Sequence, residues 1–143
     1  MSEENKEIVR KIQDAWTRNA VDELDQYFAP DFVAHSAVPG MPANLEGAKM
    51  AHGMVTQFLT DRQTQITDIF ADGDKVLMRT RATGTNGSGV PWLGAEPNGN
   101  PYDFESWSVY TLRDGKVTEH VGLNDLYTFA IQAGAVKPPA PPG

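Results

Sequence analysis

The sequence YDFESWSVYTLRDGKVTEHVG (residues 102–122) predicts a β-hairpin near the end of the chain. Its first half is rich in aromatic and β-branched residues, which favour strands. The Asp-Gly pair in RDGK (113–116) is typical of a tight turn between antiparallel strands. A second Asp-Gly pair, in ADGDK (71–75), separates two further stretches, QTQITDIFA (63–71) and KVLMRTRATG (75–84). The second half of the chain is therefore predicted to hold four antiparallel strands.

The first half of the chain has the apolar spacing of helices, with one apolar stripe along each of its two long predicted helices. His52 is offset from the stripe of its helix, so we expect it to be a partly exposed helix residue. Pro30 ends a shorter helix, and Gly134 stands just past a last one. Helices are predicted over residues 2–19, 21–28, 45–60 and 125–133, and an early strand over residues 31–37.

Strands that are segregated from helices predict an α+β fold. We expect a curved antiparallel sheet wrapped around the N-terminal helices to form a cone with an apolar pocket. The stretch GTNGSGVPWLGAEPNGNP (84–101) is long for a hairpin loop, and Trp92 within it favours docking over disorder. It is either a lid over the open end of the cone or a surface loop with one packed tryptophan. A single domain is predicted over residues 1–135, followed by the Pro-rich, flexible tail VKPPAPPG (136–143).

The composition excludes several classes of function. Hydrophobic residues make up 40% of the 143 residues and charged residues 22%, as in ordinary soluble globular proteins. The net charge of −7 argues against nucleic-acid binding, because phosphate backbones would be repelled. The chain has no cysteine, and its three histidines show neither HxH nor HxxxH spacing, so we expect no metal site. No apolar run is long enough to span a membrane, and the polar start MSEENKEIVRK favours a cytoplasmic location.

The stretch EHVGLNDLY (119–127) gathers two carboxylates and an imidazole where the last strand is predicted to meet the last helix. Asp125 is a candidate general acid/base, because a carboxylate in an apolar pocket is desolvated and its pKa rises. Alternatively, Asn124 or Asp125 simply caps the last helix. His120 faces away from Val121 on a strand, and the sequence leaves open which of the two faces the pocket. His35 is either a polar group of the pocket or a hydrogen-bonded structural histidine.

Several segments, in this order and spacing, resemble the SnoaL-like polyketide cyclases, a branch of the nuclear-transport-factor-2-like cone superfamily. The likeness covers nearly the whole chain except the tail. It rests on DFVAH (31–35), Gly47, RATGT (81–85), GAEPNGNPYDF (94–104), LRDGKVTEHVGLND (112–125) and IQAG (131–134).

The resemblance implies an α+β cone, usually dimeric, with a deep apolar pocket and no cofactor. In the cyclases, an Asp near the end of the last strand takes a proton from carbon so that the enolate can close a ring by aldol addition. Asp125 matches that position, whereas Val121 replaces the Trp that usually follows the Glu-His pair. Ser108 stands where relatives often carry a second acidic residue, and by the family register it faces the pocket.

The leading hypothesis is therefore a cofactor-independent, polyketide cyclase-like enzyme. It would act on a small hydrophobic carbonyl compound by proton abstraction, leading to aldol-type cyclisation or isomerisation. The alternative is a non-catalytic small-molecule-binding cone protein, which the absent second carboxylate favours. The catalytic candidates are Asp125, His35 and His120. The candidate substrate-binding residues are Ser108, Tyr110, Trp92, Met54 and Phe58.

The opposite face of the strand that carries Ser108 has a different character. Trp107 and Val109 lie there, on an outer sheet face that the helices do not cover. Large exposed apolar patches are rare on monomers, so we expect a homodimer through this face. Arg79 and Arg81 share a face on the neighbouring strand and are expected to pair with sheet carboxylates.

Overall fold

The computed structural model describes residues 2–142; Met1 and Gly143, the outermost residues of the predicted domain and tail, lie outside them. The order of the described helices and strands confirms the predicted α+β class. The elements are α1 (Ser2–Thr17), the 3-10 helix η1 (Val21–Gln26), β1 (Phe28–Ala34), α2 (Leu45–Phe58), β2 (Gln63–Asp72), β3 (Lys75–Thr85), the 3-10 helix η2 (Pro91–Leu93), β4 (Pro101–Arg113), β5 (Lys116–Asn124) and α3 (Leu126–Gln132).

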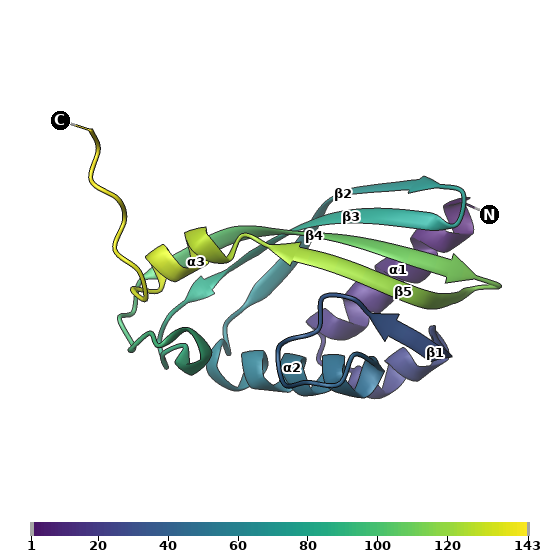
Figure 1. Ribbon diagram of the computed structural model, residues 1–143, viewed down its shortest axis with the longest axis horizontal. Helices are drawn as coiled ribbons and strands as arrows, with labels where there is room; N and C mark the ends of the chain where they lie inside the picture. The colour runs from purple at the N-terminus through teal and green to yellow at the C-terminus, as the bar shows by residue number, and fades with distance from the viewer. Residues whose placement is uncertain (1, 143) are drawn as a thin grey trace.

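The described strands form one sheet in the order β1-β5-β4-β3-β2. The four long strands pair antiparallel, and both Asp-Gly turns close hairpins as predicted. β1 pairs parallel with β5 at one edge of the sheet, and the long connection from β1 through α2 and the other strands to β5 allows this parallel pairing. Figure 1 shows a curved sheet that does not close on itself, with α1 running behind β4 and β5 and α2 along the lower edge. This is the cone-like arrangement that the sequence predicts.

The main departure from the predicted elements lies around Pro30. The predicted helix over residues 21–28 is a 3-10 helix that ends at Gln26, and the following strand begins at Phe28 and contains Pro30. Proline is tolerated there because β1 is the edge of the sheet, where a missing N–H breaks no ladder. The register between β1 and β5 also shifts between Phe28 and Val33, around the proline.

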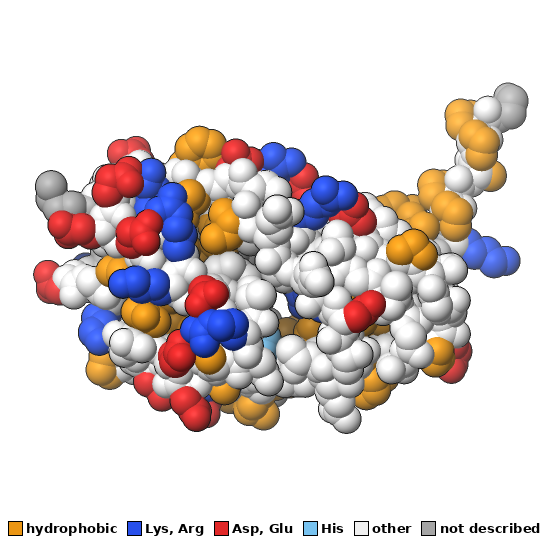
Figure 2. Space-filling model, turned by 180° about the vertical axis from the view of Figure 1, so that it is seen from behind, with side chains coloured by type: hydrophobic (Ala, Val, Ile, Leu, Met, Phe, Trp, Pro, Cys, Tyr) orange, Lys and Arg blue, Asp and Glu red, His pale blue; other side chains and the backbone are white. Residues whose placement is uncertain are grey.

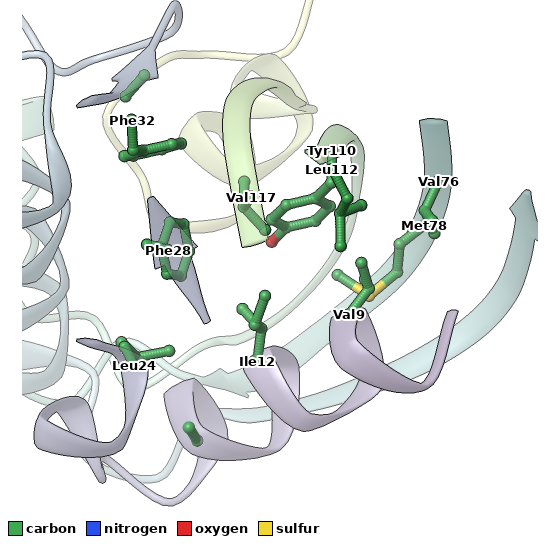
Figure 3. Packing of buried hydrophobic residues seen from close by; sticks show 12 residues of the cluster. Val9, Ile12, Leu24, Phe28, Phe32, Val76, Met78, Tyr110, Leu112 and Val117 are labelled. Carbon is green, nitrogen blue, oxygen red and sulfur yellow. The ribbon is translucent and has the colours of Figure 1, made fainter. Parts of the chain in front are cut away.

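The main core joins α1 to the concave face of the sheet. Val9, Ile12 and Ala15, from the predicted stripe of the first helix, are fully buried. Figure 3 shows the first two of these packed beneath the side chains that the sheet projects inward, among them Met78 and Tyr110. Burial of such side chains contributes roughly 1.5–3 kcal/mol each, and it fixes α1 against the strands.

The long loop 84–101 is docked, as Trp92 led us to expect. Asn86 is fully buried, and its amide nitrogen donates to the carbonyl oxygens of Glu96 (2.8 Å) and Ala133 (2.9 Å). Val90 and Ala95 pack in a second core cluster together with Phe129 of α3. The loop is therefore held against α3.

Beyond α3 the chain leaves the body of the molecule. Residues 137–142 have no regular structure and are exposed, and Figure 1 shows this tail extending away from the sheet and the helices. Its flexibility and the boundary at residue 135 stay predictions. No described helix is both long and apolar enough to cross a membrane.

Candidate functional site

A cavity of about 420 Å³ lies between α1, α2 and the inner face of the sheet. Figure 2 shows a hollow near the middle of the face opposite to that of Figure 1. All but three of the lining side chains are polar, which corrects the predicted apolar pocket. The lining residues are Gln13, Trp16, Thr17, Asn19, His52, Thr56, Leu59, Thr60, Arg62, Thr64, Met78, Thr80, Ser106, Ser108 and Asn124.

Small side chains on β4 and β5 make room for this cavity. Ser106 stands opposite Asn124, and Ser108 stands opposite Gly122. The hydroxyl of Ser106 donates to the side-chain oxygen of Asn124, which fixes the amide at the cavity wall. Ser108 is among the lining residues, and its contact with a substrate stays a prediction.

His120 faces the inside of the sheet, which answers the question that the sequence left open. Val121, its neighbour, is 46% exposed on the outer face. Burial lowers the pKa of His120 to about 4, so the ring is neutral at pH 7, and its Nε2 has no hydrogen-bond partner within residues 2–142. The ring centroid lies 4.7 Å from that of Tyr110, whose own pKa is raised by burial. Neither side chain lines the cavity: Tyr110 belongs to the main core cluster, and the half-buried His120 lies against its ring.

Asp125 caps α3 instead of entering the cavity. One carboxylate oxygen accepts from the backbone N–H of Thr128 (3.1 Å) and the other from its hydroxyl (2.6 Å). These hydrogen bonds lower the pKa of Asp125, and its side chain is exposed. The expected apolar surrounding and raised pKa are therefore wrong. Asn124 points inward at the end of β5. Asp125, the next residue, therefore turns outward and caps the start of α3.

The remaining predicted site residues also lie outside the cavity. His35 is exposed, and its Nε2 lies 3.0 Å from a carboxylate oxygen of Glu119. Phe58 and Trp92 pack edge-to-face with ring centroids 6.0 Å apart, beside the docked loop, and Met54 is half-buried. None of these four predicted residues, His35, Phe58, Trp92 and Met54, lines the cavity. The cavity thus does not bring together His35, His120 and Asp125.

His52 is a cavity residue that the sequence analysis placed among partly exposed helix residues. Its Nε2 lies 3.1 Å from the side-chain oxygen of Asn19, and its ring lies 4.8 Å from that of Trp16. An amide oxygen only accepts, so with this assignment Nε2 carries the proton and Nδ1 keeps its lone pair. Burial, and then the charge of Arg62, lower the pKa of His52 below 6.5, so the ring is neutral at pH 7.

The end of α1 positions Asn19 for this contact. Asn19 has a backbone φ of 58°, in the left-handed region, just after the helix. Asparagine is one of the few residues that tolerates this conformation, which commonly ends helices. The four-residue spacing of His52 and Thr56 on α2 is the sequence signal that could have identified a polar face here.

Arg62 is the second cavity residue that the sequence analysis missed. It follows α2 closely in the chain, and its guanidinium carbon lies 5.9 Å from the centroid of the Phe104 ring. Burial lowers the pKa of Arg62, although a guanidinium stays protonated at neutral pH. Nothing in the pattern around residue 62 distinguishes it from an ordinary surface arginine, so the sequence offered no signal.

The family model of the SnoaL-like polyketide cyclases matches residues 6–133. The chain belongs to the SnoaL-like polyketide cyclase family. Among curated proteins, none matches this chain.

Solved structures of SnoaL-like proteins are similar over most of the chain. A protein from Bacillus cereus ATCC 10987, described as a candidate polyketide cyclase, is 26% identical, with 93% of this chain and 82% of that one covered and a TM-score of 0.80. IdmH from Streptomyces antibioticus, also described as a candidate polyketide cyclase, is 28% identical, with 91% and 98% covered and a TM-score of 0.79. AclR from Streptomyces galilaeus, described as a candidate hydroxylase, shares the fold at 21% identity, with 99% and 91% covered and a TM-score of 0.83.

The cavity of this SnoaL-like chain contains no carboxylate, since neither Asp nor Glu is among the lining residues. Its ionisable groups are the neutral imidazole of His52 and the cation of Arg62, accompanied by hydroxyl and amide side chains. Among residues 2–142, no three His, Cys, Asp or Glu side chains cluster as metal ligands would. The arrangement can transfer a proton through imidazole and stabilise negative charge through guanidinium.

Proposed function

We propose that this protein is a polyketide cyclase-like enzyme that takes a proton from a carbon next to a carbonyl group and so promotes an aldol-type cyclisation or isomerisation. The observation that carries the proposal is the neutral imidazole of His52, in the same cavity as the unpaired guanidinium of Arg62. Membership of the family and the likeness to two candidate cyclases support the same class of reaction.

His52 is the base in this proposal. Asn19 accepts a hydrogen bond from Nε2–H and so holds the tautomer in which Nδ1 is basic. When Nδ1 takes the proton, the ring becomes an imidazolium, and the hydrogen bond to Asn19 becomes charge-assisted and stronger. The lowered pKa makes His52 a weak base, so the substrate needs an acidic carbon, such as that of a β-dicarbonyl compound.

Arg62 stabilises the negative charge that develops on the carbonyl oxygen. The guanidinium lies in the cavity, over the Phe104 ring, before any substrate binds, and a donor placed in advance is most effective for such stabilisation. Hydroxyl groups of the lining, such as those of Thr80 and Ser108, are further neutral donors. After the new carbon–carbon bond forms, the imidazolium returns its proton to the alkoxide oxygen, which restores the neutral His52.

The second candidate function is a small-molecule-binding protein without catalysis. One observation favours it: the carboxylate that matches the family's acid/base position is engaged in capping α3 and lies outside the cavity. In that case the cavity would bind a carbonyl compound, and no proton would leave carbon.

Exchange of carbon-bound hydrogen for deuterium separates the two functions. The protein is incubated with activated ketones in deuterated water, and loss of the C–H signal is followed by NMR. We expect exchange by the wild type and a loss of about a hundredfold or more in His52→Gln, because a general base contributes at least that factor.

Asp125→Asn is the matched control, since asparagine caps a helix about as well as aspartate. We expect this variant to keep the wild-type exchange rate. Full exchange in His52→Gln, or loss of exchange in Asp125→Asn alone, would rule out His52 as the base. Binding without any exchange by the wild type would favour the binding protein.

A further inference from the structure

We propose that the cavity recognises a carboxylate, and that Arg62 binds it, so the natural ligand is a carbonyl compound that also carries a carboxylate group. This inference rests on the proposed function in taking the cavity as the substrate site. Where the carboxylate occupies Arg62, the neutral hydroxyl donors of the lining, such as Thr80 and Ser108, stabilise the developing oxyanion. Its chemistry differs from the hydrophobic carbonyl compound that the sequence predicts.

Among the described residues, the guanidinium of Arg62 has no anionic or hydrogen-bonding partner, and it lies over the Phe104 ring, 5.9 Å from its centroid. Its Nε is buried without an acceptor among them. In contrast, Arg18, Arg79 and Arg81 each pair with at least one carboxylate. A partly buried charge without a counter-charge lowers stability, so proteins rarely keep one without a function.

The carboxylate nearest to Arg62 in the chain, that of Asp61, forms its hydrogen bonds with another residue. Asp61 precedes Arg62 directly in the chain. Its carboxylate accepts instead from the backbone N–H of Thr85 (3.1 Å) and from the Thr85 hydroxyl (2.6 Å). These bonds lower the pKa of Asp61 and keep it engaged with β3. The fold thus satisfies Asp61 elsewhere and leaves the guanidinium open to a ligand.

The net positive charge of the cavity lining also favours an anionic ligand. Arg62 carries the one formal charge among the lining residues, and no Asp or Glu opposes it there. A guanidinium presents paired N–H donors that match the two oxygens of a carboxylate. A single arginine with no lysine beside it compensates one negative charge, which fits a carboxylate better than a phosphate dianion. The volume of about 420 Å³ suits a molecule of one or two rings.

Three probes with the same acetylphenyl frame test this inference: 4-acetylbenzoate, which is an anion, and its methyl ester and primary amide, which are both neutral. Their affinities for the whole protein are measured by calorimetry. We expect the carboxylate to bind at least about 30-fold more tightly than the ester or the amide, because it alone pairs with a buried cation.

Variants assign this preference to Arg62. Arg62→Met keeps most of the apolar stem and should abolish the preference, whereas Arg62→Lys should retain part of it, because lysine keeps the charge without the paired donors. Arg81→Met is the matched control, since Arg81 pairs with Asp103 on the outer face. We expect it to keep the full preference.

The outcomes for the two proposals are separable. Equal binding of acid and ester by the wild type, or no binding of the acid, overturns the carboxylate inference, even if the protein catalyses deuterium exchange. A preference for the acid that depends on Arg62 supports the carboxylate inference even if the activated ketones show no deuterium exchange, and that lack of exchange counts against the proposed reaction alone. If Arg62→Met does not fold, the wild-type comparison and Arg62→Lys decide.

Discussion

Arg62 combines burial with an unpaired charge, a combination that lowers stability in the absence of a ligand. Its replacement by methionine removes the buried cation but keeps a side chain of similar length over the Phe104 ring. We therefore expect Arg62→Met to raise the free energy of unfolding by about 1–3 kcal/mol, since removal of buried charge in favour of an apolar residue is often stabilising. Urea unfolding measures this change.

The paired arginines provide the reference for that measurement. Arg81→Met breaks an exposed ion pair with Asp103, and exposed ion pairs contribute little to stability. It should leave the free energy of unfolding unchanged or slightly lower. A clear loss of stability in Arg62→Met would mean that the guanidinium stabilises the fold, and the argument for a ligand would lose its main support.

At the scale of elements, alanine at two glycine positions of α2 is expected to change the free energy of unfolding in opposite directions. A Cβ at Gly47 would stand 1.8 Å from the backbone oxygen of Pro42, whereas one at Gly53 would meet nothing within 4 Å. Gly47→Ala should therefore lower the free energy of unfolding by about 1–3 kcal/mol or more, because the loop before α2 must move. Gly53→Ala should raise it by about 0.5–1 kcal/mol, as alanine favours helix.

Thermal or urea unfolding of the two variants shows directly whether each substitution raises or lowers the free energy of unfolding. Since the two sites share one helix, a general effect of alanine on α2 would move both in the same direction. Equal shifts would show that the approach of Pro42 to the helix is looser than its geometry indicates.

Periodicity predicts most of the elements but not the orientation of β5, on which the site depends. The two Asp-Gly turns and the stripe of the first helix are local features of the sequence, and they were predicted correctly. In β5, however, Val117 is buried and His120, three residues on, also faces inward. The register shifts between Thr111 and Leu112 of β4, so that one extra residue, Thr118, interrupts the alternation.

Without that bulge, alternation from Val117 would turn Val121 inward and His120 outward. The sequence does not reveal this shift, because both faces of β5 carry apolar side chains: Val117 inside, and Val121 and Leu123 outside. The orientation of Asn124 and Asp125 follows from the same shift. The cavity residues His52 and Arg62 were missed for a different reason, because long-range packing of α2 on α1 and the sheet creates their environment.

At the scale of the whole molecule, the apolar outer face of the sheet is its most unusual surface. An apolar row crosses four strands, because Phe70 stands opposite Leu77, Leu77 opposite Val109, and Val109 opposite Val121. Beside it, Trp107 stands opposite Leu123. Four of these six side chains are well exposed, up to 74% for Leu123. Soluble monomers rarely expose a continuous patch of this kind.

We propose that two copies of the chain pack through this face, as the resemblance to dimeric cones implies. Sedimentation at micromolar concentration should give a dimer. Trp107→Lys should shift it toward monomer, because a second cation beside Arg79, whose guanidinium carbon lies 5.7 Å from the centroid of the Trp107 ring, would replace an apolar side chain in the contact and lose its hydration there. Met50→Lys, at an exposed apolar position on α2, is the control and should leave the mass unchanged. A monomeric wild type, or equal dissociation by both variants, would place the contact elsewhere or exclude it.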